Sequence, residues 1–438
     1  MTKVHKILDI NIINSKPKLE LFLNKLRTRQ IDVPPTIRQT VEKILEDVRI
    51  NGDKAVFEFT KEFDRHELPI KYKPKGKKPI DDPVIEKMLK TSINRIRLFH
   101  ERQIEKSWIL KERGAVLGQI ITPIQRVGVY IPGGKAAYPS TVLMNVIPAQ
   151  VAGVKEIALC VPTPKGFFNP YVLMAIEMLG IKEVYRVGGA QAIAAMAYGT
   201  KTIKRVDKIV GPGNIYVATA KRLVFGQVDI DMIAGPSEIL IIADDSADAS
   251  LIAADMISQA EHDELASSVL ITDSNKISAK VLVELNKQLN KISKKDIVRA
   301  SLKNYGAIIT TKNLDEAIKI ANQIAPEHLE VMIDKPRSVL SRITNAGAIF
   351  LGKWSPEPIG DYSAGPNHTL PTGGTARFAS PLGTYDFFKR TSLIDFTEEG
   401  FMRLAPTVER FAILEGLDAH AESIRIRQAQ SLLAPEEA

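Results

Sequence analysis

From residue 127 to residue 351 the chain alternates short apolar runs with glycine turns and with stretches of helical spacing. Val127–Ile131 leads into one such turn, and Lys208–Val210 leads into another at Gly211-Pro212-Gly213-Asn214. Repeated alternation of strand and helix predicts a parallel sheet covered by helices. Because a second block with the same pattern begins at Glu238, we expect an α/β fold with two Rossmann-like parallel-sheet domains.

The two ends of the chain are predicted to be helical extensions. Thr36–Asn51 has apolar residues at helical spacing and ends at Asn51-Gly52, a good C-cap. Pro83–Trp108 is a second long amphipathic stretch. After Pro381 the sequence is again typical of a helix, and Thr407–Leu433 is predicted to form a C-terminal helical tail.

Length and charge narrow the class of protein. The 438 residues suggest two or three domains. A net charge of +8 would suit a nucleic-acid partner, but most basic residues are interleaved with acidic ones. The dense basic stretch Lys71–Lys78 lies in a Pro/Gly-rich segment, for which we favour a solvated loop. We therefore expect no nucleic-acid partner.

The single cysteine and the hydropathy pattern bear on the compartment. Cys160 lies in the apolar run Ile157–Val161, where core packing is favoured over a nucleophilic role, and one cysteine allows no intramolecular disulfide. The first residues lack the apolar stretch of a signal peptide, and no run of about 18 apolar residues occurs. We expect a cytoplasmic protein without a membrane partner.

Three glycine turns follow predicted strands in the first block, at Pro132-Gly133-Gly134, Gly188-Gly189 and Gly211-Pro212-Gly213-Asn214. Such turns let backbone N–H groups and a helix N-terminus approach a phosphate. Ligands of open α/β sheets bind at the carboxyl ends of strands, where these turns lie. No GxGxxG pattern is present. The spacing alone therefore leaves open whether the glycines serve a dinucleotide or only tight turns.

Two histidine motifs are candidates for chemistry. Gln259 and His262 end a predicted helix three residues apart, so their side chains share one face and can present two donors to a metal. Glu327-His328 places a carboxylate beside an imidazole, a pair that can supply a general base and activate water. Spacing alone favours structural roles over catalytic ones. His262 would bind carbonyl groups at the helix terminus, and Glu327 would face solvent beside a capping histidine.

Two further segments carry polar residues that could contribute to a functional site. The irregular stretch Gly360–His368 is rich in polar and turn-forming residues, and loops of this kind often carry function. Glu415 and His420 lie on a predicted helix five residues apart, so they are not in register, and a surface role is the default for both.

These features fall together in one known pattern. The segment Ile230–Glu238, continuing through Asp255 to Gln259-Ala260-Glu261-His262, closely resembles the signature of histidinol dehydrogenases. The resemblance extends over nearly the whole chain. It includes the segments Val187–Ala194, Gly211–Asn214, Pro326–Leu329 and Asp361–His368. A long signature with gaps of the right size is far more specific than any single motif.

The resemblance implies a role for each matching residue. Four residues would bind one zinc per subunit: Gln259, His262, Asp361 and His420. Glu327 and His328 would be the catalytic acid–base pair. These residues would contact the substrate: Ser237, Gln259, His262, His328, Asp361, His368, Glu415 and His420. Glu415 and His420 would come from the partner subunit, which implies a homodimer with shared active sites. Tyr130, Gln191 and Asn214 would contact NAD.

The implied reaction is the last step of histidine biosynthesis. L-histidinol would be oxidised to L-histidine through bound L-histidinal, with loss of four electrons to two NAD. The resemblance also implies a division into domains. Residues 1–26 would form the N-terminal helical extension, 27–129 with 238–381 the metal and substrate domain, 130–237 the NAD domain, and 382–438 the tail that contributes to the partner's active site.

Three alternatives remain. A related dehydrogenase could oxidise another polar alcohol on the same scaffold, but His368, Glu415 and His420 favour histidinol. A zinc hydrolase could use Glu327-His328 on water alone, against which the glycine turns argue. A nucleic-acid binder would be supported only by the net charge of +8. Pro366 is a departure from the family pattern at a position without a chemical role.

Overall fold

The computed structural model describes residues 9–31, 33–74, 79–133 and 138–433, which form two compact units. The first comprises residues up to Gln103 together with Ile124–Phe387, and the second comprises Ile104–Pro123 and the residues from Phe388 onward. Gly134 and the Lys75–Lys78 end of the basic stretch lie outside the described residues. Among those residues, no helix is long and apolar enough to span a membrane.

One six-stranded sheet of the first unit is parallel throughout, with the order β1-β12-β11-β10-β13-β14. Its strands are β1 (Asn11–Ile13), β10 (Glu238–Ala243), β11 (Ser267–Thr272), β12 (Ala307–Thr310), β13 (His328–Met332) and β14 (Ala348–Leu351). Alternate residues of β10 point to opposite faces. Ile239 and Ile241 belong to one apolar core and Leu240 and Ile242 to another.

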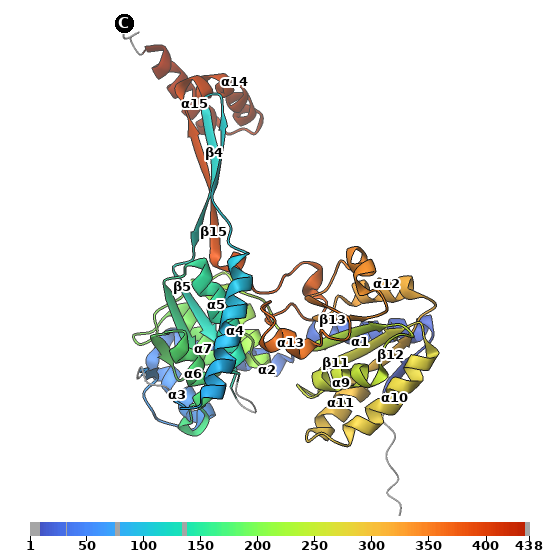
Figure 1. Cartoon of the computed structure of the whole chain (residues 1–438). Coiled ribbons are helices and arrows are strands. Elements are labelled where there is room, and N and C mark those ends of the chain that lie inside the picture. The colour runs from blue at the N-terminus through green and yellow to red at the C-terminus, as the bar shows by residue number, and fades with distance from the viewer. Residues whose placement is uncertain (1–8, 32, 75–78, 134–137, 434–438) are drawn as a thin grey trace, which may run out of the picture. The chain divides into compact units, whose positions relative to one another are not determined.

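Helices cover both faces of this sheet, as Figure 1 shows. The core with Ile241 includes side chains of α9 (Ala249–Ala260), α10 (Asn275–Leu289) and α11 (Lys295–Tyr305). The core with Ile242 includes side chains of α1 (Lys16–Ile31) and α12 (Leu314–Ile324). A sheet buried on both faces explains why its strands are continuous apolar runs.

The other six-stranded sheet of this unit has the order β2-β7-β6-β5-β8-β9. Its strands are β2 (Lys71–Tyr72), β5 (Arg126–Tyr130), β6 (Glu156–Cys160), β7 (Glu183–Tyr185), β8 (Lys208–Val210) and β9 (Asp229–Ile230). Only β2 among them pairs antiparallel. The predicted pair of parallel-sheet domains is confirmed. Cys160 is fully buried in β6, and burial raises the pKa of its thiol.

One core of this second sheet joins helices from distant parts of the sequence. It contains side chains of α2 (Pro35–Asn51), α3 (Asp53–Asp64), α7 (Gly189–Tyr198) and α8 (Ile215–Val224). On β5 packs α5 (Pro139–Ala152), which contacts α4 (Pro83–Glu101) and α6 (Pro170–Met178). The sequence prediction assigned residues 27–129 to the domain of the other sheet. The apolar faces of α2 and α3 are buried with α7. The division into domains stays a prediction.

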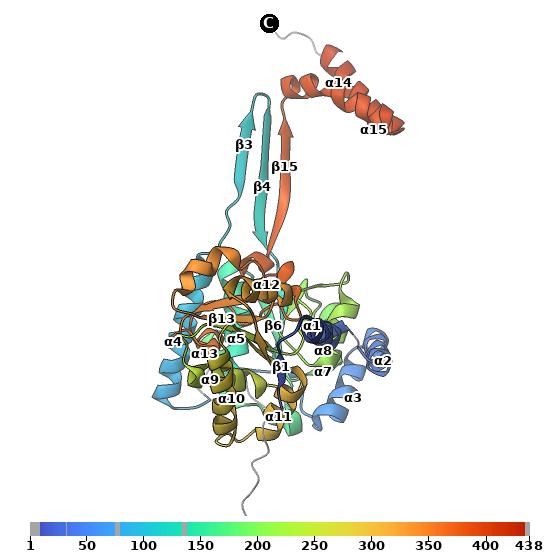
Figure 2. The ribbon, with the colours of Figure 1, turned by 90° about the vertical axis from the view of Figure 1, so that its right-hand side faces the viewer.

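The second unit is a three-stranded antiparallel sheet with two helices, and Figure 2 shows its strands side by side. Its elements are β3 (Trp108–Glu112), β4 (Ala115–Pro123), β15 (Phe388–Phe396), α14 (Glu398–Leu414) and α15 (Asp418–Leu433). The hairpin turn at Gly114 has φ +72°, and a Cβ at Gly400 would lie 1.9 Å from the carbonyl oxygen of Gly114. This close approach requires glycine at both positions.

Two secondary-structure predictions are wrong in this unit. The helix predicted over Pro83–Trp108 ends at Glu101, and Trp108 begins β3. The segment after Pro381 was predicted to be helical, but Phe388–Phe396 is a strand that pairs with β4 along its whole length. The pairing partner lies far away in the sequence, so no local pattern indicates it. The tail predicted over Thr407–Leu433 is helical except for a break between α14 and α15.

Candidate active site

The predicted catalytic pair lies where α12 ends and β13 begins. Ala325 adopts a left-handed conformation with φ +53° directly after α12, and His328 is the first residue of β13, aligned with Ile239 of β10. Glu327 is 7% and His328 4% exposed. The pair therefore lies at the amino ends of β10 and β13, and the solvent-facing alternative for Glu327 is excluded by its burial.

The main chain of one residue, Glu238, holds both members of this pair. The N–H of Glu238 donates to Oε2 of Glu327 at 2.9 Å, and Nδ1 of His328 lies 3.0 Å from the carbonyl oxygen of Glu238. A carbonyl oxygen only accepts hydrogen bonds, so Nδ1 of His328 must carry the proton. The lone pair is then on Nε2, which has no hydrogen-bond partner among the described residues and lies 3.8 Å from Oδ1 of Asp361.

Burial sets the protonation of the two groups. It lowers the pKa of His328, which keeps the imidazole neutral and therefore basic at Nε2. Burial also raises the pKa of Glu327 well above its usual range, and the Arg29 guanidinium opposes that shift. Arg29 reaches this point from α1 through a buried ion pair with Glu238. A neutral imidazole beside a carboxyl group with a raised pKa is suited to proton transfer.

Beside this pair lies a cluster with the character of a metal site. One ligand atom each of His262, Glu357 and Asp361 lies within 4.8 Å of the other two. Glu357 begins and Asp361 nearly ends the short helix α13 (Glu357–Tyr362), so the i, i+4 spacing places both carboxyl groups on one face. Burial, followed by the nearby Asp361 carboxylate, raises the pKa of Glu357 to about 10. Two crowded carboxyl groups beside an imidazole favour a bound cation.

Two of the four predicted zinc ligands, His262 and Asp361, are thus brought together. Gln259 is buried in the last turn of α9, and its Oε1 has no hydrogen-bond partner in the described part of the chain. A buried acceptor without a donor is costly, and a cation would satisfy it. Nitrogen and oxygen donors of these kinds are ligands that zinc accepts, so the residues present fit the metal. His420 lies on α15 in the second unit, where it is exposed.

The other predicted substrate contacts are distributed as follows. Nδ1 of His368 lies 3.1 Å from the carbonyl oxygen of Asp361, and burial lowers the pKa of His368, so in the neutral ring Nε2 carries the lone pair. Ser237 is half-buried and directly precedes β10. Glu415 follows α14 in the second unit and is exposed. That Glu415 and His420 reach a partner's active site stays a prediction.

The residues predicted to contact NAD lie at the carboxyl ends of strands in the other sheet. Tyr130 ends β5, and its phenol oxygen accepts a hydrogen bond from the N–H of Gly189 at 3.1 Å. Gln191 is 1% exposed in the first turn of α7, and its Oε1 lacks a partner among the described residues. Asn214 is the N-cap of α8, and its Oδ1 accepts from the N–H groups of Tyr216 and Val217.

The glycine turns at this edge are closely packed. A Cβ at Gly133 would lie 2.3 Å, and one at Gly188 2.4 Å, from side-chain atoms of Pro162. Small residues therefore bring the backbone of two turns and the N-terminus of α7 to the same edge, beside the Gln191 Oε1 atom that lacks a partner in the described part of the chain. This arrangement fits a dinucleotide at the carboxyl ends of parallel strands.

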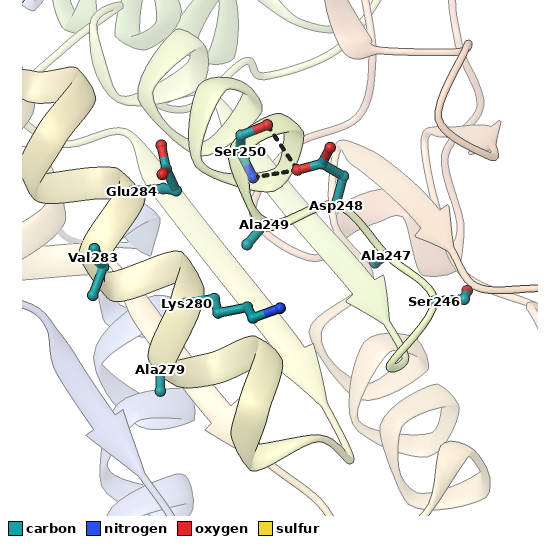
Figure 3. A pocket seen from close by; sticks show the side chains of 9 residues that line it. All are labelled: Ser246, Ala247, Asp248, Ala249, Ser250, Ala279, Lys280, Val283 and Glu284. Carbon is teal, nitrogen blue, oxygen red and sulfur yellow. Dashed lines mark hydrogen bonds between the residues drawn. The ribbon is translucent and has the colours of Figure 1, made fainter.

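A surface hollow of about 760 Å³ lies elsewhere, between the start of α9 and α10 (Figure 3). Its lining includes Asp248, whose Oδ1 accepts from the N–H and the hydroxyl group of Ser250. The carboxylate caps the helix and is thereby satisfied. None of the predicted site residues lines this hollow.

Sequence reasoning missed three groups that the structure places around the site. They are Glu357 in the metal cluster, the Arg29–Glu238 ion pair behind the catalytic pair, and the Lys221–Asp231 ion pair behind the glycine turn at Gly211. The spacing of Glu357 and Asp361 in Pro356-Glu357-Pro358-Ile359-Gly360-Asp361 could have indicated the first. The two ion pairs join distant segments and leave no local signal.

Comparison with known proteins agrees with this geometry. The family model described as histidinol dehydrogenase matches residues 27–428. The chain is 52% identical over 418 residues to histidinol dehydrogenase of Aquifex aeolicus, covering 94% of this chain and 97% of that protein. It is 52% identical over 397 residues to the enzyme of Bacillus subtilis, covering 89% and 93%.

A solved structure matches nearly the whole fold. The crystal structure of histidinol dehydrogenase from Elizabethkingia anophelis superposes with a TM-score of 0.91 at 36% identity, covering 98% of this chain and 100% of that one. The match to the family model and the identity to curated relatives cover most of the chain. The chain therefore belongs to the histidinol dehydrogenase family and is an oxidoreductase.

Proposed function

We propose that this chain catalyses the zinc-dependent oxidation of L-histidinol to L-histidine through bound L-histidinal, with two NAD, as the last step of histidine biosynthesis. The observation that carries the proposal is the buried Glu327-His328 pair, held by the main-chain N–H and carbonyl groups of Glu238 beside the cluster of His262, Glu357 and Asp361. This arrangement combines a general base, a second carboxyl group and a metal-binding cluster at one place.

The proposed zinc ligands are Gln259, His262 and Asp361, with His420 of the partner subunit. When bound, zinc would hold the amine and imidazole nitrogens of the substrate and fix its orientation. Ser237 and His368, together with Glu415 of the partner subunit, would line the rest of the substrate site. The lone pair on Nε2 of His368 suits a hydrogen bond from the substrate.

The first oxidation depends on His328. Its neutral Nε2 accepts the proton of the substrate hydroxyl group, while the carbinol carbon releases a hydride and becomes the aldehyde carbon. NAD would accept this hydride and, in the second oxidation, another. The Nδ1 hydrogen bond to the carbonyl oxygen of Glu238 stabilises the imidazolium that forms, because the peptide oxygen keeps its orientation.

The second oxidation requires water. Glu327 in its ionised form takes a proton from the water that attacks the aldehyde, which gives the hydrate. Loss of one hydroxyl proton and one hydride from the hydrate then gives the carboxylic acid. Each oxidation removes two electrons, so the conversion of alcohol to acid consumes two NAD. Retaining the aldehyde in the site matters because a free amino aldehyde is reactive.

The proposed NAD contacts are Tyr130, Gln191 and Asn214. Because Oδ1 of Asn214 caps α8, its Nδ2 group is the part available to a ligand. The unpartnered Oε1 of Gln191 offers an acceptor at the same edge. These groups support a dinucleotide and argue against the hydrolase alternative, which would need no second ligand.

A homodimer with shared sites is part of the proposal. On α14, the side chains of Leu404, Val408 and Phe411 follow helical spacing and are 45%, 44% and 62% exposed. An apolar stripe of this kind supports coverage by another chain. We further propose a cytoplasmic location, without nucleic-acid or membrane partners.

The test is NADH formation by the zinc-loaded protein. Histidinol with NAD should yield NADH, chelation should abolish it, and added zinc should restore it. An amino alcohol without an imidazole ring should react poorly. NADH from that alcohol but not from histidinol would instead indicate a related dehydrogenase, and hydrolysis of an ester without NAD would indicate the hydrolase.

A further inference from the structure

Asp231 belongs to the segment that carries the family resemblance, yet it has no role in the proposed chemistry. Its side chain is 1% exposed and forms an ion pair with Lys221, whose side chain is 3% exposed. Asp231 directly follows β9, and Lys221 lies in the second half of α8. The pair is therefore a buried contact within the sheet that carries the predicted NAD residues.

This ion pair holds both backbone groups of one residue in the glycine turn. The N–H of Gly211 donates to Oδ2 of Asp231 at 2.8 Å, and Nζ of Lys221 donates to the carbonyl oxygen of Gly211 at 2.9 Å. Oδ1 of Asp231 also accepts from the N–H of Met232 at 2.6 Å. Each end of the pair thus has a hydrogen bond to the main chain as well as to its partner.

The same turn packs closely against the main chain of Tyr130. Gly211 has φ +110°, and a Cβ at this position would lie 2.1 Å from the carbonyl oxygen of Tyr130. Only glycine can occupy such a position. The turn is therefore fixed on one side by the end of β5 and on the other by Lys221 and Asp231.

Three residues after Gly211 the chain reaches Asn214, the N-cap of α8. Because Oδ1 of Asn214 is used by the cap, the direction of its Nδ2 group follows the position of the turn. Lys221 lies on the helix that Asn214 begins, so the ion pair connects this helix to the turn that precedes it.

A buried ion pair is weak evidence for stability, because the desolvation of two charges offsets most of their attraction. Lys221 and Asp231 both bind the main chain of Gly211, and a role in placing this backbone explains that better than a role in stability. We propose that Lys221 and Asp231 are positioning residues for the dinucleotide, which hold the Gly211 turn and Asn214 in the conformation that binds it. This inference rests on the proposed use of NAD.

A second buried lysine in this sheet offers a matched control. Lys208 is the first residue of β8, and Gly211 is the residue directly after this strand. Nζ of Lys208 lies 2.9 Å from Oδ2 of Asp229 in β9. The Lys208 side chain is 7% exposed. Lys208→Met therefore removes a buried lysine from an ion pair of the same composition at the opposite end of the strand.

The test is the dissociation constant of NADH, measured by the change of its fluorescence on binding, in zinc-loaded protein. Wild type is measured first, and absence of binding there would overturn the proposed use of NAD together with this inference. With wild-type binding established, Lys221→Met and Asp231→Asn should each weaken NADH binding roughly tenfold or more, since small misplacements of contact groups are costly. Lys221→Arg should recover part of the loss, and zinc content should not change.

Two results would overturn the positioning role alone. One is unchanged NADH affinity in folded Lys221→Met and Asp231→Asn, and the other is an equal loss in Lys208→Met. If the variants at positions 221 and 231 do not fold, the positioning role is tested by amide hydrogen exchange of the wild-type protein. The Gly211 amide should be protected without NADH, because it already donates to Asp231, and rapid exchange there would contradict the inference.

Discussion

Nδ1 of His328 lies 3.0 Å from the carbonyl oxygen of Glu238, whose own N–H donates to Oε2 of Glu327 at 2.9 Å. The main chain of Glu238 therefore sets the tautomer of the imidazole through its carbonyl oxygen and the orientation of the carboxyl group through its N–H. The relationship explains how two adjacent residues can act as separate proton acceptors, because each is held through a different atom of the same strand end.

His328→Gln should remove the base and keep a donor for the carbonyl oxygen of Glu238. We expect kcat for histidinol to fall by roughly 10²–10⁴, the usual contribution of a positioned general base. Steady-state kinetics checks this, with zinc content and thermal unfolding as controls for the site and the fold. A variant that keeps more than about a third of wild-type kcat would contradict the assigned role.

Glu357→Gln tests the carboxyl group that the sequence did not indicate. Because Glu357 lies in the cluster with His262 and Asp361, its loss should weaken zinc binding by roughly 10- to 100-fold, as is typical of groups that support metal ligands. Competition with a chromophoric chelator measures the affinity directly. Glu284→Gln, on the surface of α10, is the control and should bind zinc like wild type. Equal affinities in all three proteins would exclude Glu357 from the metal site.

The sequence predicted most of the strands of both sheets, and the physical reason is locality. The catalytic roles of Glu327 and His328 were implied by the family resemblance and not by local spacing, and they stay a prediction. Strands such as Glu238–Ala243 are continuous apolar runs, and Gly52 follows α2 as the predicted C-cap. What could not be predicted depends on contacts between distant segments. The ladder between β4 and β15 has no local signature, and Lys221 and Asp231 look like solvated charges until the fold buries them.

Asp386 should make stability depend on pH in a defined direction. Burial raises its pKa from 3.8 to about 6, so the folded state binds the proton more tightly than the unfolded state. The contribution of Asp386 to stability is then greatest below pH 4 and is lost as the pH rises toward 6.

Asp386→Asn should abolish this slope, since the amide oxygen can still accept from the N–H of Gly383. The free energy of unfolding at pH 7 should rise on the order of 1–3 kcal/mol. Urea unfolding at pH 4, 5, 6 and 7 gives the comparison. A variant with the wild-type slope, or one less stable at pH 7, would show that Asp386 does not titrate as described.

Shared active sites predict complementation between two inactive variants. Mixed dimers of His328→Gln and His420→Asn contain one site with both defects and one site with neither. Random reassociation of equal amounts should therefore recover about a quarter of wild-type activity, because half of the dimers are mixed and each has one intact site. Activity is measured after unfolding and refolding the mixture. No recovery, with dimers present, would mean that His420 serves the site of its own chain.

The central claim is a four-electron oxidation in one site, and its most direct test is the stoichiometry of the complete reaction. Limiting L-histidinol is incubated with excess NAD and zinc-loaded protein until NADH formation stops, and the product is identified. The account predicts two NADH for each histidinol, with L-histidine as the product and no free aldehyde. One NADH for each histidinol, with L-histidinal released, would contradict it.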